Sequence, residues 1–155
     1  ELHQIKFSGM KKAFLNRLPL TPEAVETIQK LYAFTQENAS GIRWGTGRSS
    51  SSFSYTVDSI KKKFNIFAVL NSGDTSRILL NFGVMKGIIP DEELHAFREL
   101  LNQLPDVELP TYMVDEGKYP SIPVKSVIQP ENFERFTNEV LRLQALVKES
   151  KENKL

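Results

Sequence analysis

The stretch Phe53–Phe82, FSYTVDSIKKKFNIFAVLNSGDTSRILLNF, decides the fold. In residues 53–57, aromatic and branched side chains alternate with Ser and Thr, which is the period of a half-buried strand. Residues 64–70 are apolar on both faces, which is typical of a central strand. Residues 71–74 are the turn formers Asn, Ser, Gly and Asp, and a third apolar run follows at 77–82. The stretch therefore predicts a three-stranded antiparallel meander.

Outside this stretch the apolar residues recur at helical spacing. Helices are predicted to begin at Pro22, Pro90 and Pro130, because proline fits the first turn of a helix and an acidic residue follows each one. Residues 10–18 are interpreted as a short fourth helix. Residues 119–124 predict an extra edge strand, since proline is tolerated at a sheet edge. We expect an α+β fold in which three or four helices pack the meander, mainly on one face.

The length and composition of the chain are those of one globular domain. The chain has 155 residues, 40% of them hydrophobic and 25% charged. It has no cysteine and two histidines, which argues against disulfides, a structural zinc site or a histidine-rich metal centre, and no cofactor is expected. No signal-peptide pattern opens the sequence and no apolar run is long enough to span a membrane, so we expect a cytoplasmic protein without membrane contact. A single domain is expected over residues 1–148, with a flexible charged tail over residues 149–155.

The charges are divided along the chain. Residues 1–88 carry 12 Lys and Arg against 6 Asp and Glu, whereas residues 89–155 carry 8 against 13. Such a division can mark a surface that attracts polyanions. The alternative is a match of opposite charges within the fold or with a partner domain.

Residues 41–49, GIRWGTGRS, are the most unusual segment. The glycines would let backbone N–H groups converge on an anion, Arg43 and Arg48 can pair with phosphate, and Trp44 can stack on a base. The segment follows a helix and precedes a strand, so it is not a nucleotide-binding loop, which has the opposite order. The alternative is a connecting loop in which Trp44 fills part of the core.

Three consecutive lysines lie at the predicted turn between the first two strands, where they would meet phosphates if the sheet edge faced nucleic acid. The alternative is a solvated turn. The residues predicted to contact nucleic acid are Arg43, Trp44, Arg48, Lys61, Lys62, Lys63 and Arg77.

A catalytic site is less evident. Asp106, Glu116 and Lys118 match the order of acids and lysine in some metal-dependent nucleases, but the latter two fall in a predicted turn. His95 lies among acids on a predicted helix and is interpreted as a surface residue. No serine nucleophile motif is present. The sequence therefore predicts neither catalytic residues nor metal ligands.

The order of features resembles an uncharacterised accessory domain of prokaryotic nuclease-like, restriction and defence proteins. The resemblance rests on Trp44-Gly45-Thr46-Gly47, on Ser52-Phe53, on the meander and on the segment Pro120-Ser121-Ile122-Pro123, within residues 21–148. It implies biology linked to DNA, and it fits a chain that begins at Glu1 as a fragment of a longer protein.

The leading hypothesis is a noncatalytic module that contacts DNA phosphates or positions a neighbouring nuclease domain. The alternatives are a protein-interaction or dimerisation module and, third, a metal-dependent nuclease.

Overall fold

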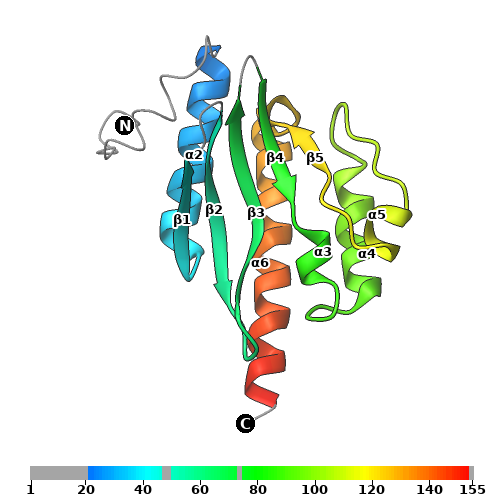
Figure 1. The fold of residues 1–155 in the computed structure, drawn as a ribbon. Coiled ribbons are helices and arrows are strands. Elements are labelled where there is room, and N and C mark those ends of the chain that lie inside the picture. Colours follow the sequence, from blue (N-terminus) through cyan, green and yellow to red (C-terminus); the bar gives the residue numbers. More distant parts are fainter. Residues whose placement is uncertain (1–20, 47–49, 73–74, 154–155) are drawn as a thin grey trace.

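The computed structural model describes residues 21–46, 50–72 and 75–153, and it is an α+β fold built on one antiparallel sheet (Figure 1). The sheet has five strands in the order β1-β2-β3-β4-β5, so each strand pairs with its neighbours in the chain. The strands are β1 (Gly41–Thr46), β2 (Ser50–Asp58), β3 (Lys63–Ser72), β4 (Thr75–Leu80) and β5 (Ser121–Pro123).

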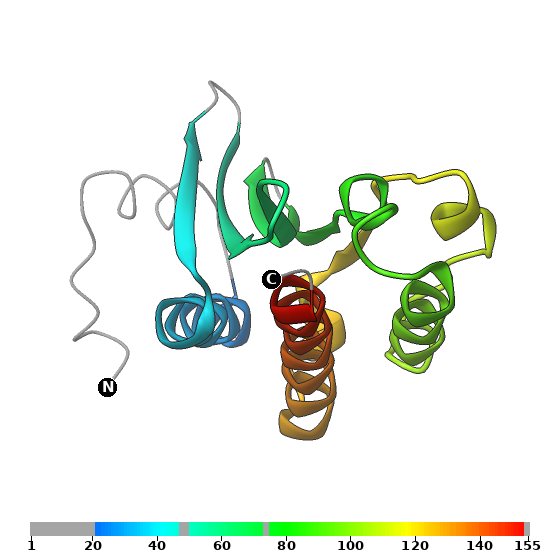
Figure 2. The same ribbon diagram turned by 90° about the horizontal axis from the view of Figure 1, so that it is seen from below.

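The three long helices lie on one side of the sheet (Figure 2). They are α2 (Pro22–Asn38), α4 (Asp91–Leu101) and α6 (Pro130–Asn153). Short helical turns join the other elements, namely α3 (Phe82–Met85), α5 (Tyr112–Asp115) and the 3-10 helix η2 (Val124–Val127). The predicted helix starts at Pro22, Pro90 and Pro130 agree with the structure to within one residue.

Local chemistry explains where α2 begins. The hydroxyl of Thr21 accepts a hydrogen bond from the backbone N–H of Ala24 at 3.1 Å, and Pro22 occupies the first turn. Ile28 and Leu31 then fall on one face and are buried against the sheet.

The predicted three-stranded meander is the centre of a larger sheet. The edge strand predicted at residues 119–124 is confirmed as β5. The prediction of a loop at residues 41–49 is wrong for residues 41–46, which form β1 and pair with β2. Glycines at alternate positions concealed the strand period, because glycine is the usual signal of a turn. The third predicted strand ends at Leu80, and Phe82 begins α3 instead.

Two further predictions concern the ends of the chain. The helix predicted at residues 10–18 lies outside the described residues. The backbone of residues 149–153, which were predicted as a tail, continues α6 to Asn153.

A chain of aromatic rings joins the sheet to the helices. It runs from Phe34 in α2 through Tyr55 and Phe67 in the sheet to Phe136 in α6, with ring centroids 5.4, 5.3 and 5.2 Å apart. It continues through Phe97 in α4, at 6.4 Å, to Phe82 in α3, at 5.9 Å. Aromatic pairs at these separations are favourable beyond the area that they bury. The rings therefore connect four helices to two strands.

A β-bulge adds a residue to β3 where it enters the core. Tyr55 pairs with Phe67 and Thr56 pairs with Asn65, so Ile66 has no partner on β2. Asn81 binds the backbone of the bulge: its N–H donates to the carbonyl of Ile66 at 3.2 Å and its side chain to the carbonyl of Asn65 at 2.9 Å. The bulge is thus tied to the point at which β4 ends.

Gly83 allows close packing between α3 and the loop after α5. A Cβ atom at this position would lie 2.3 Å from the ring of Tyr119 and 2.7 Å from the carbonyl oxygen of Gly117. The N–H of Gly83 also donates to the carbonyl of Lys118 at 3.1 Å. This contact therefore requires a residue without a side chain.

Gly83→Ala should lower the free energy of unfolding by about 1–3 kcal/mol, because backbone as well as the tyrosine ring must move. Urea denaturation measures this change. The matched control is Gly41→Ala, since a Cβ atom there has nothing within 4 Å. Equal stability of the two variants would contradict the packing described.

Candidate nucleic-acid interface

The register of the strands divides their side chains between two faces. Phe53 and Tyr55 point toward the helices, because the rings of Tyr32 and Phe34 in α2 contact them. Side chains alternate along a strand, so Ser54, between them, projects from the opposite face. Cross-strand pairs extend that assignment to the neighbouring strands. The open face, turned away from the three long helices (Figure 2), carries Gly41, Arg43, Gly45, Ser52, Ser54, Thr56, Asp58, Lys63, Asn65, Ala68, Leu70, Arg77, Leu79, Ser121 and Pro123.

At the centre of the open face, Ser54, Thr56 and Ala68 are short and buried, while Leu70 and Leu79 are half-buried. The two arginines lie on strands that flank this centre, Arg43 on β1 and Arg77 on β4. Three inter-strand steps separate them, which places their backbones about 15 Å apart.

Arg77 is held in one orientation by β5. Its Nε donates to the hydroxyl of Ser121 at 2.6 Å, and one terminal nitrogen donates to the carbonyl of the same residue at 2.9 Å. Guanidinium carries five N–H donors, so these two bonds leave others for a ligand. The β4–β5 pairing therefore orients a cation on the open face before any ligand arrives.

Arg43 is exposed on the edge strand. Within the described part of the chain, no acid forms an ion pair with it. Its charge is thus available to a ligand on the open face.

The lysine turn lies at one end of the sheet. Lys61, Lys62 and Lys63 are exposed, and the turn is closed by hydrogen bonds between Ser59 and Lys62. Lys63 lies 3.9 Å from Asp58, which offsets its charge locally. Lys61 and Lys62 extend the basic character beyond the end of the open face.

Two predicted residues are not brought to this surface. Trp44 pairs with Phe53 on the helix side, where its ring lies 5.5 Å from Tyr32 and 5.6 Å from Phe53. Its contacts are those of the core-filling alternative. Arg48 lies outside the described residues.

The acids of the nuclease alternative are each held by a different lysine. Asp106 lies 3.4 Å from Lys125, and Glu116 lies 3.7 Å from Lys118. In the ranges that the structure describes, no three His, Asp or Glu side chains are grouped to hold a metal. The geometry therefore favours the open face over this site.

His95 takes part in a network that the sequence did not predict. Its Nε2 lies 2.7 Å from Asp115 in α5, and Arg98 donates to its Nδ1 at 3.2 Å. Because Arg98 is only a donor, Nδ1 must be unprotonated, and Nε2–H therefore donates to the carboxylate. Arg98 also donates to the carbonyl of Leu109 at 3.1 Å. The network fixes α5 and the preceding loop against α4.

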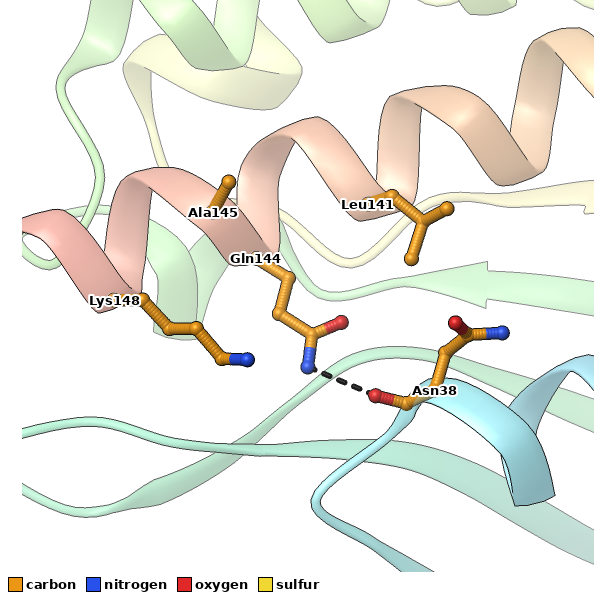
Figure 3. Close-up of a pocket in the computed structure, with 5 residues that line it drawn as sticks. All are labelled: Asn38, Leu141, Gln144, Ala145 and Lys148. Atoms are coloured by element: carbon orange, nitrogen blue, oxygen red, sulfur yellow. Dashed lines mark hydrogen bonds between the residues drawn. The ribbon is translucent and has the colours of Figure 1, made fainter.

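A small cavity of 170 Å³ lies between the end of α2 and α6 (Figure 3). Its main polar group, the buried amide of Gln144, donates to the carbonyl of Asn38 at 3.0 Å and accepts from the hydroxyl of Tyr55. These bonds point into the protein, so the amide holds α6 to α2 and β2. The other cavity near a helix end, 290 Å³ beside Asn102, is lined by a side chain that is already bonded to the backbone of Leu109.

Comparison of the chain with models of protein families, with curated proteins and with solved structures gives no match. The resemblance to accessory domains of nuclease-like proteins therefore stays a prediction. No helix in the described ranges is long and apolar enough to cross a membrane.

Tyr55→Phe should lower the free energy of unfolding by about 1–3 kcal/mol at neutral pH, because it leaves the buried acceptor of Gln144 without its donor. Burial raises the pKa of Tyr55 well above its ordinary value of 10.0. The protonated hydroxyl of Tyr55 therefore contributes fully to the free energy of unfolding below pH 10. As the pH rises further, this contribution falls by up to about 1.4 kcal/mol per pH unit.

Urea unfolding at neutral and alkaline pH tests both effects. The stability difference between the native chain and Tyr55→Phe should narrow above pH 10. Tyr112→Phe, at an exposed tyrosine of α5, is the control. A constant difference across the alkaline range would refute the buried-donor role.

Proposed function

We propose that this chain is a noncatalytic module that contacts the phosphate backbone of nucleic acid through its open face. The observation that carries the proposal is the placement of Arg43 and Arg77 on one face of the sheet. Arg77 is fixed by Ser121, and Arg43 is exposed and unpaired within the described ranges. The partly exposed Ser52 supplies a hydroxyl on a strand between them.

Electrostatics and geometry support a phosphate ligand. Arginine can form two parallel hydrogen bonds with one phosphate group, and each neutralised phosphate releases condensed counterions. A cation that is held in place before binding loses less side-chain entropy when the ligand arrives. Lys61 and Lys62 attract the same polyanion from the end of the sheet. In the proposal, the module acts in the cytoplasm and positions a neighbouring nuclease of the restriction or defence type on DNA.

A second candidate function is contact with another protein chain. It is favoured by the half-buried Leu70 and Leu79, which give the open face an apolar component beside its arginines. Sheet faces of this kind also serve as protein contacts. The two candidates use the same surface and differ in the ligand.

Arg43→Ala and Arg77→Ala should each weaken binding to a mixed-sequence DNA duplex severalfold and reduce the slope of log affinity against log salt by about 1. Fluorescence anisotropy of a labelled duplex over a range of salt concentrations measures both quantities. Arg135→Ala, which removes an exposed arginine from α6, is the matched control.

Unchanged affinity in both folded sheet variants would contradict the proposal. Absence of duplex binding at low salt, together with a molar mass that rises with protein concentration in light scattering, would favour the second candidate instead.

A further inference from the structure

We infer that the open face takes double-stranded nucleic acid in preference to single strands, and that it does so without reading base sequence. This inference rests on the proposed function and names the class of ligand. It is carried by the distribution of aromatic side chains between the two faces of the sheet.

The aromatic residues of the sheet face the core. Trp44, Phe53, Tyr55 and Phe67 all contact rings on the helix side. The open-face positions in the described ranges are instead occupied by Arg, Lys, Asp, Ser, Thr, Asn, Ala, Leu, Gly and Pro, none of which is aromatic. The described aromatic side chains of the sheet therefore lie on the face opposite Arg43 and Arg77, and Trp44, which is partly buried, packs against Tyr32 and Phe53.

Single-strand binding surfaces depend on the groups that this face lacks. Proteins that bind single strands stack successive bases on aromatic side chains, at about 1–3 kcal/mol per base. A duplex keeps its bases stacked on one another and presents phosphates at its surface. A face with cations and without aromatic rings therefore suits a duplex better than a single strand.

The spacing of the arginines also suits a duplex. Their backbones lie about 15 Å apart, which is comparable to the width of the major groove, about 12 Å. Between them lie Ser54 and Ala68, which are short and buried. When the arginines rest on phosphates at the two sides of a groove, these side chains are too short to reach the base edges. Binding is therefore expected to be independent of sequence.

The test compares a short labelled duplex with each of its separated strands at the same salt concentration. The duplex should bind at least about tenfold more tightly, and unlabelled duplexes of permuted sequence should compete equally. Tighter or equal binding of the single strands would overturn this inference while leaving the proposed function intact. Absence of binding to any of these nucleic acids would overturn the proposed function as well.

A second binding experiment uses the variant Leu79→Tyr, because this change places an aromatic ring on the open face beside Ala68. Single-strand affinity should rise by about fivefold or more, with little change for the duplex. No gain in the folded variant would contradict the argument that missing aromatic groups exclude single strands.

Discussion

The chain of aromatic rings from Phe34 to Phe82 is the constraint on which the rest of the structure depends. Tyr55 and Phe67 are central to it, since they stack on each other across two strands and contact rings of α2 and α6. Both are fully buried. Burying such side chains supplies most of the favourable free energy of a core, so the helices must pack against the face that presents them.

The character of the opposite face follows from this constraint. Strand side chains alternate, and a strand that gives Phe53 and Tyr55 to the core gives Ser52 and Ser54 to the other face. Charged groups are costly to bury without partners, so Arg43 and Arg77 lie on the face away from the helices. Ser121 then orients Arg77 from the last strand. The same alternation that builds the core thus assembles a basic surface.

The sequence indicates the core more completely than the surface. The alternation at Phe53–Val57 predicts β2, and the proline at residue 22 predicts the start of α2, because both patterns are local in the sequence. The glycines around Trp44 hide a strand, so the sequence predicts a loop where β1 forms. The common face of Arg43 and Arg77 depends on the register across β2 and β3, which includes a bulge at Ile66. The partner of His95 lies 20 residues away on a turn of only four residues. No short-range sequence pattern predicts the shared face of the two arginines or the contact between His95 and Asp115.

The most direct test of the central claim is nuclear magnetic resonance of the isotopically labelled chain during titration with a DNA duplex. The side-chain Nε–H signals of Arg43 and Arg77 should shift first, together with backbone amides of β1, β2 and β4. The amide signals of α4 and α6 should stay in place. Shifts confined to the helices, or no shifts at low salt, would contradict the assignment of the open face as the binding surface.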